Sequence, residues 1–141
     1  MSILDLSSKG LASLEMRKLF DFEQLLLGDN QITTLSTDIG VLGRLKKLII
    51  FSNRLETLPT EIGDLTDLEE LDLSGNRLIS IPPEIGKLKK LRKLNLAYNR
   101  LTEIPVEISH LTELKELYLM SNNLTIIPEE IRNLKLKYLF V

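Results

Sequence analysis

The sequence predicts an α/β solenoid, a stack of coils in which short parallel strands alternate with short helical or extended segments around one core. Two observations predict this fold. Leucines alternate with other residues in short segments, as on one face of a strand. Each such segment is followed by an asparagine, and these asparagines recur every 23 residues, at Asn30, Asn53, Asn76, Asn99 and Asn122. A fixed period of this length is typical of proteins built from stacked repeats.

The individual copies justify the elements in order. In LEELDLSGNRLISIPPEIGKL, residues 68–88, Leu71 and Leu73 face the core from the predicted strand. Five more apolar residues recur at spacings that a closed coil can turn toward the same centre: Leu68, Leu78, Ile81, Ile85 and Leu88. Prolines follow where the convex segment begins and no strand donor is needed: Pro59, Pro82, Pro83, Pro105 and Pro128. Only stacking buries such a set, so neighbouring strands should pair in parallel.

The copies are expected to form a single domain over residues 1–141. Residues 1–21 are a partial first repeat, in which Lys9 stands where asparagine is expected. Five repeats follow over about residues 22–135. Residues 136–141 begin a truncated last strand, and one residue is missing between Leu134 and Leu139.

These copies match the pattern LxxLxLxxNxLxxLPxxIGxLxx, and over essentially its whole length the chain resembles the leucine-rich repeat family. The resemblance implies a right-handed superhelix with a parallel sheet on its concave side. Short 3-10, helical or extended segments would form the convex side. It also implies protein binding. This variety of repeat is similar to that of intracellular Ras-pathway scaffolds and their plant relatives, and to that of short bacterial leucine-rich proteins, some of which are secreted into hosts.

Two polar columns run through the repeats. The five asparagines are predicted to form a structural ladder, because a buried amide can both donate to and accept from backbone groups that water cannot reach. The second column is acidic and precedes the isoleucine of each convex segment: Asp38, Glu61, Glu84, Glu107 and Glu130. We interpret it as a solvated convex face rather than a metal site, since stacked carboxylates repel and lack converging neutral ligands.

Composition limits the remaining functions. The chain is 43% hydrophobic and 27% charged, has a net charge of −2 and contains no cysteine. We therefore expect no nucleic acid or membrane as partner and no cofactor or metal. The lone His110 is expected on the convex surface. The first residues, MSILDLSSKG, lack the pattern of a signal peptide, which predicts a cytoplasmic protein, with a secreted effector as the alternative.

The residues that flank the inward leucines should line the concave face. They include two apolar groups separated by a polar centre. The predicted partner-binding residues are Leu26, Ile49 and Phe51 in the first group, Glu70, Asp72 and Asn95 in the centre, and Tyr98, Tyr118, Met120, Tyr138 and Phe140 in the second group. Lys47, Glu70, Lys93 and Glu116 are expected to form an ion-pair ladder across the strands.

Exposed aromatic and methionine side chains are typical of protein interfaces. We therefore predict a non-enzymatic module that binds a protein partner, of unknown identity, on its concave sheet. One alternative is that the aromatic rings only stack and stabilise the sheet. Another is a homo-oligomer that assembles through uncapped terminal strands. Its predicted contacts are Tyr138, Leu139, Phe140 and Val141.

Overall fold

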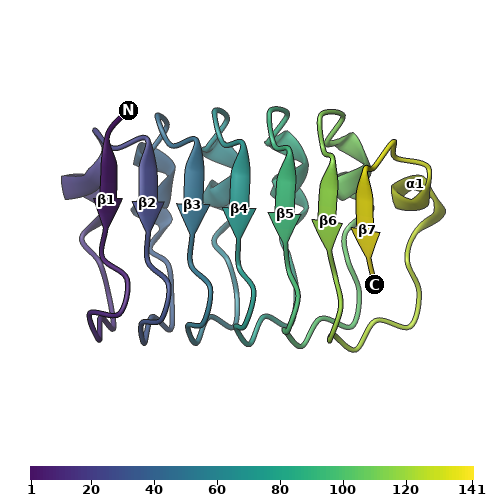
Figure 1. Ribbon diagram of the computed structural model, residues 1–141, viewed down its shortest axis with the longest axis horizontal. Coiled ribbons are helices and arrows are strands. Elements are labelled where there is room, and N and C mark those ends of the chain that lie inside the picture. The colour runs from purple at the N-terminus through teal and green to yellow at the C-terminus, as the bar shows by residue number, and fades with distance from the viewer.

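The computed structural model describes all residues, 1–141, as one stack of coils (Figure 1). Seven strands lie side by side in the order β1 to β7, and every neighbouring pair is parallel. The short helices lie behind the sheet, on the opposite face of the stack. The predicted α/β solenoid with one parallel sheet is confirmed.

All elements are short. The strands are β1 (Ile3–Asp5), β2 (Gln24–Leu26), β3 (Lys47–Ile49), β4 (Glu70–Asp72), β5 (Lys93–Asn95), β6 (Glu116–Tyr118) and β7 (Tyr138–Phe140). The 3-10 helices are η1 (Met16–Leu19), η2 (Thr37–Val41), η3 (Thr60–Asp64), η4 (Pro83–Lys87) and η5 (Val106–His110). The last convex segment is instead a single turn of α-helix, α1 (Glu129–Arg132).

The strands stack in register, so equivalent residues of successive copies become neighbours. Gln24 pairs with Lys47, Lys47 with Glu70, and Glu70 with Lys93. The central residue of each strand points into the stack, and it is fully buried in the five inner strands: Leu25, Leu48, Leu71, Leu94 and Leu117. These leucines belong to one continuous core that runs from η1 to α1.

The backbone turns into the left-handed region just after each of the first six strands. The value of φ is 56° at Ser8, 54° at Asp29, 52° at Ser52, 65° at Gly75, 56° at Tyr98 and 56° at Ser121. From the second coil onward, the next residue is the ladder asparagine, which the turn directs inward. The position therefore favours glycine and small polar residues, because a larger side chain costs energy there.

From η3 onward, the convex segments begin at proline. Pro59, Pro82 and Pro105 are the N-caps of η3, η4 and η5. Gly63 is needed for close approach, since a Cβ there would lie 2.6 Å from the carbonyl oxygen of Glu84 in the next coil. The recurring Ile-Gly pair thus brings one coil onto the next.

Candidate functional site

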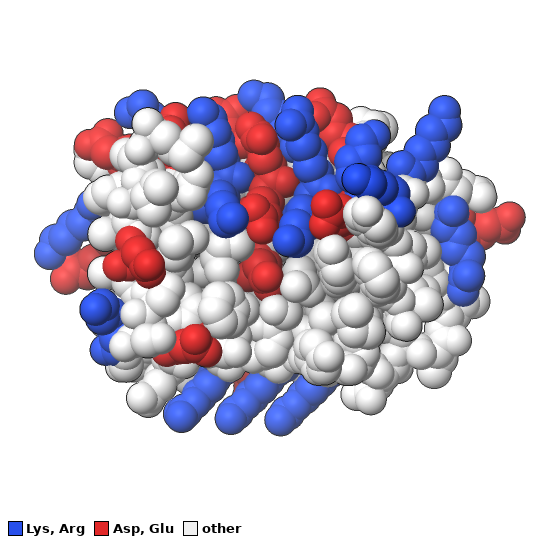
Figure 2. Space-filling model, in the orientation of Figure 1, with Lys and Arg blue, Asp and Glu red and all other residues white.

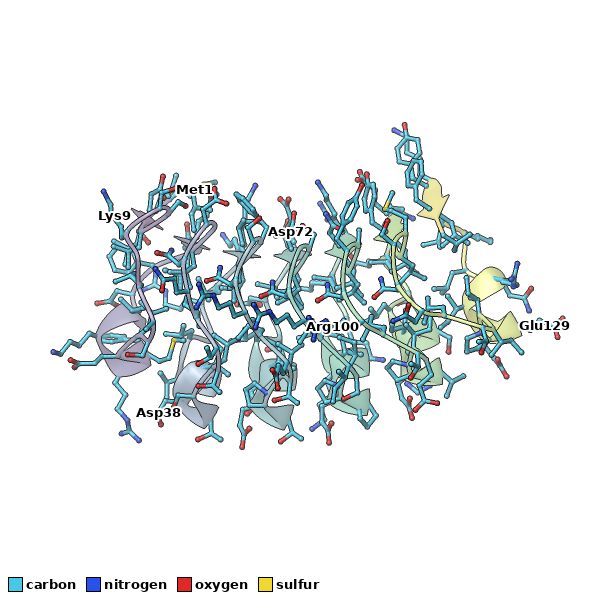
Figure 3. All side chains as sticks on the ribbon, turned by 90° about the horizontal axis from the view of Figure 1, so that it is seen from below. Met1, Lys9, Asp38, Asp72, Arg100 and Glu129 are labelled. Carbon is cyan, nitrogen blue, oxygen red and sulfur yellow. The ribbon has the colours of Figure 1, made fainter.

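The predicted binding residues lie on the outer side of the sheet, which we call the concave face. In Figure 2 this face is turned toward the viewer. Charged side chains gather where the strands begin, and the area over the ends of β5, β6 and β7 is largely uncharged. Figure 3 shows Asp72 on the sheet side of the stack and Asp38 on the opposite, helical side.

The side chains of the first apolar group are less exposed to solvent than predicted. Ile49 is only 9% exposed, so it offers little surface to a partner, and its role as a partner-binding residue stays a prediction. It is paired in register with Leu26 on one side and Asp72 on the other, and both neighbours are half-buried. Phe51 is half-buried as well, because its ring covers Gly28 of the preceding coil. The side chains of this group therefore mainly pack against one another over the sheet.

The polar centre is tied together within the sheet. Glu70 bridges two lysines, with carboxylate oxygens 2.9 Å from Lys47 Nζ and 3.5 Å from Lys93 Nζ. Asp72 accepts hydrogen bonds from the Ser74 N–H at 2.9 Å, the Ser74 hydroxyl at 2.6 Å and the Asn95 amide at 3.2 Å. These contacts confirm the first three members of the predicted ion-pair ladder.

The fourth member of the predicted ladder does not join it. Glu116 accepts a hydrogen bond from the Tyr118 hydroxyl at 2.9 Å instead of pairing with Lys93. Lys93 Nζ lies 5.8 Å from the centre of the Tyr118 ring. The bond to Glu116, followed by burial, raises the pKa of the Tyr118 hydroxyl above its ordinary value. Glu116 therefore supports the aromatic group rather than the ladder.

Three rings of the second group stack on one another. The centroids of Tyr118 and Phe140 are 5.0 Å apart with an interplanar angle of 12°, and those of Tyr138 and Phe140 are 6.1 Å apart at 21°. Lys137 Nζ lies 5.2 Å from the centre of the Tyr138 ring. Such contacts stabilise a sheet by themselves, so these three rings alone do not require a partner.

Tyr98 differs from the other aromatic residues of this face. It is 63% exposed, its ring stacks on no other ring, and its hydroxyl makes no hydrogen bond within the chain. It also has a φ of 56°, at the position that the other coils fill with serine, aspartate or glycine. A bulky residue in this conformation is uncommon and strained. Neither packing nor backbone geometry accounts for a tyrosine here.

The five asparagines form the predicted structural ladder. The Asn76 amide donates to the carbonyls of Ile50 at 2.9 Å and Leu73 at 3.0 Å, and its oxygen accepts from the Leu55 N–H at 3.0 Å. Asn30, Asn53, Asn99 and Asn122 make equivalent bonds. The first four rungs are buried, and Asn122 is half-buried.

The convex side carries the acidic column and the single histidine. No group of three or more histidine, cysteine or acidic residues is placed to hold a metal ion. Glu61, Glu84 and Glu107 lie in the first turns of η3, η4 and η5, where the helix ends favour negative charge. His110 is exposed at the end of η5. None of the helices has the length and apolarity needed to cross a membrane.

A row of charged residues stands outside the predicted site. Arg54, Arg77 and Arg100 each follow a ladder asparagine, and all three are exposed. Their signal in the sequence is the dipeptide Asn-Arg, which recurs in three consecutive copies. They lie along the edge of the stack that adjoins the strand ends.

A stack of in-register coils with an asparagine ladder defines a leucine-rich repeat solenoid. The family model described as "Leucine rich repeat" matches residues 22–78, 66–124 and 89–141. The chain belongs to the leucine-rich repeat family, whose members generally act as protein-interaction modules. A comparison with curated protein sequences found no match.

Solved structures of similar fold come from several kinds of protein. A leucine-rich repeat protein of Leptospira interrogans is 35% identical, with a TM-score of 0.77 over 91% of this chain and 39% of its own. A TDR receptor is 33% identical, with a TM-score of 0.83 over 92% of this chain and 24% of its own. An internalin of Listeria monocytogenes is 25% identical, with a TM-score of 0.72 over 86% of this chain and 36% of its own. The chain thus spans well under half the length of each.

Proposed function

We propose that this chain is a non-enzymatic module that binds a protein partner on the concave face, around Tyr98, Tyr118, Met120, Tyr138 and Phe140. The family generally binds protein partners, and one neighbour in fold is a receptor. Residues of this kind are enriched at binding hot spots. The flanking polar centre, Glu70, Asp72 and Asn95, would form part of the rim.

Tyr98 carries this proposal. The alternative that the aromatic residues serve only to stabilise the sheet accounts for the stacked rings of Tyr118, Phe140 and Tyr138, and for Phe51 over Gly28. It does not account for Tyr98, which is exposed, unstacked and held in a left-handed conformation. A strained residue that the fold does not need is typical of a functional site.

Replacing Tyr98 with asparagine tests the proposal. Asparagine tolerates a positive φ better than tyrosine does, so Tyr98→Asn should raise or preserve the urea midpoint. The same variant should lose capture of the partner that the wild-type chain retains on an affinity resin, as read by mass spectrometry. The matched control is Ser52→Asn, at the equivalent position two strands earlier along the chain, where φ is 52°.

The two measurements together decide the outcome. Loss of binding with unchanged or greater stability, in Tyr98→Asn but not in Ser52→Asn, supports a binding role for Tyr98. If Tyr98→Asn captures the same proteins as the wild type, or if it unfolds at clearly lower urea than Ser52→Asn, the ring serves the fold and the proposal fails.

Self-association is a second candidate function, favoured by the exposure of β7. Tyr138 and Phe140 are 41% and 42% exposed, and Val141 is 68% exposed. Beside them lies a pocket of about 300 Å³, lined in part by Leu119, Leu124, Ile126, Ile127 and Val141. Light scattering over a range of protein concentrations tests this candidate. It predicts a mass that rises with concentration in the wild type and not in Phe140→Lys, whereas a constant monomeric mass removes it.

A further inference from the structure

A row of three arginines runs along the edge of the stack where the strands end. The backbone N–H groups of Arg54, Arg77 and Arg100 each donate to a carbonyl of the preceding coil, at 2.9, 2.8 and 2.9 Å. Figure 2 shows basic side chains projecting from the lower edge, and Figure 3, seen from below, labels Arg100 there. Neighbouring parallel strands lie about 4.8 Å apart, so the guanidinium groups form a short, regular series.

These three side chains make no ion pair and no hydrogen bond within the chain, which sets them apart from the other arginines. Each of the other four has a partner. Arg17 lies 2.9 Å from Asp38, Arg44 lies 3.6 Å from Asp21, Arg92 lies 3.6 Å from Glu113, and Arg132 donates to the Ile127 carbonyl at 3.4 Å. The row is thus the one place where arginines of this chain remain without a partner.

The arginine row does not stabilise the folded chain by any contact of its side chains. Like charges placed side by side on neighbouring coils repel one another. Two acidic residues follow nearby in the chain, Glu56 and Glu103, and neither pairs with an arginine of the row. A cationic edge that the chain leaves uncompensated is suited to an anionic ligand.

The carboxylates of the concave face do not compensate the row. Glu70 lies between Lys47 and Lys93, Glu116 accepts from the Tyr118 hydroxyl, and Asp72 accepts from Ser74 and Asn95. None of these carboxylates pairs with an arginine of the row. The charge that this edge offers to a partner is therefore positive.

We propose that the arginine row binds the carboxylates of an acidic polypeptide segment of the partner that occupies the concave face. This inference rests on the proposed function, because it describes the chemistry of the same partner. Arg100 is two residues from Tyr98, so one segment can cover both. Side chains on one face of an extended segment recur every ~6.8 Å, an interval that flexible arginine side chains can match. Their planar guanidinium groups bind carboxylates in a bidentate manner.

A nucleic acid fits this surface less well. Single strands bind by stacking their bases on free aromatic faces beside a basic groove. Here Tyr118, Phe140 and Tyr138 stack on one another, and Tyr98 is the one unstacked tyrosine. The net charge of −2 also opposes binding of a long polyanion.

The test measures binding of a fluorescein-labelled oligoglutamate peptide by fluorescence anisotropy at low ionic strength, where screening is weak. We expect the wild-type chain to bind it and added salt to weaken the complex. The variant Arg54→Gln, Arg77→Gln, Arg100→Gln should bind about tenfold more weakly or worse, since charge-assisted contacts are lost. The control variant Arg17→Gln, Arg44→Gln, Arg132→Gln removes the same charge elsewhere and should bind within about twofold of the wild type.

Three results would overturn the inference. The first is that the wild type does not bind oligoglutamate, and the second is that both triple variants lose oligoglutamate binding equally. The third is that the wild type binds an oligothymidylate of matched charge as tightly as oligoglutamate or more tightly, and that the arginine-row variant loses this binding. Circular dichroism confirms that each variant is folded. Tyr98→Asn should retain oligoglutamate binding, so a failure of the proposed function, seen in partner capture, is distinguishable from a failure of the arginine row.

Discussion

The ring of Phe51 occupies the space that a side chain at Gly28 would need. The two residues hold the same position in consecutive coils, since Gly28 is two residues after the end of β2 and Phe51 is two residues after the end of β3. Gly28 is buried although it belongs to an outward-facing column, and Phe51 is half-buried over it. A missing side chain in one coil thus makes room for a large one in the next.

This pairing predicts a strong coupling between the two positions. Gly28→Ala should lower the free energy of unfolding by about 1–3 kcal/mol, because the ring has to move. In a Phe51→Ala background the same change should cost little. Urea denaturation of the four members of this double-mutant cycle measures the coupling. Additive effects would show that the ring does not depend on Gly28.

The asparagine ladder predicts losses that depend on the rung. Asn76→Ala should lower the free energy of unfolding by about 2–5 kcal/mol, because the buried Leu55 N–H loses its partner and the Ile50 carbonyl loses the shorter of its two side-chain hydrogen bonds. Asn122→Ala should cost less, since that rung is half-buried. Exposed Asn123→Ala is the control and should change stability little. Equal losses at Asn76 and Asn123 would contradict a structural ladder.

The convex glycines predict opposite effects of one substitution at two positions. Gly63→Ala should destabilise the chain by about 1–3 kcal/mol, because its Cβ would meet the Glu84 carbonyl of the next coil. At Gly43 a Cβ meets nothing within 4 Å. Gly43→Ala should therefore be neutral or stabilising by about 0.4–1 kcal/mol, through the unfolded state. Thermal unfolding of both variants measures the difference, and a common sign would refute close packing at Gly63.

The bond between Tyr118 and Glu116 predicts a change in titration. The pKa of the Tyr118 hydroxyl is raised above its ordinary 10.0, chiefly by this hydrogen bond. A raised folded-state pKa means that the contribution to stability is present below pH 10 and is lost as the pH rises through the folded value. Ultraviolet difference spectra of wild type against Tyr118→Phe report this titration. In a Glu116→Gln background the pKa should fall toward its ordinary value, and an unchanged pKa would assign the shift to burial.

The sequence was sufficient to predict the fold, the ladder and the outward direction of Tyr98. All three follow from the 23-residue period, because a fixed register decides which residues become neighbours and which face they share. The 23-residue period did not predict which of several neighbouring residues a side chain contacts. Glu116 has both Lys93 and Tyr118 within reach and bonds to the tyrosine. The low exposure of Ile49 depends on how its neighbours pack around it, and the repeat period does not predict that packing.

The arginine row shows the opposite case, a pattern present in the sequence that the fold does not explain. Arg54, Arg77 and Arg100 are as regular as the asparagines before them, but regularity alone does not distinguish a solvated edge from a binding edge. Only the contacts of the other four arginines reveal that the row lacks partners.

The sequential strand order has a consequence for how the chain comes apart. Each coil touches only the coil before and the coil after it, so no contact spans the length of the molecule. Opening can then begin at either end and advance one coil at a time, while the middle stays closed. Every added coil closes a loop of the same size, so a longer array of this kind would gain stability without a slower search for its first contacts.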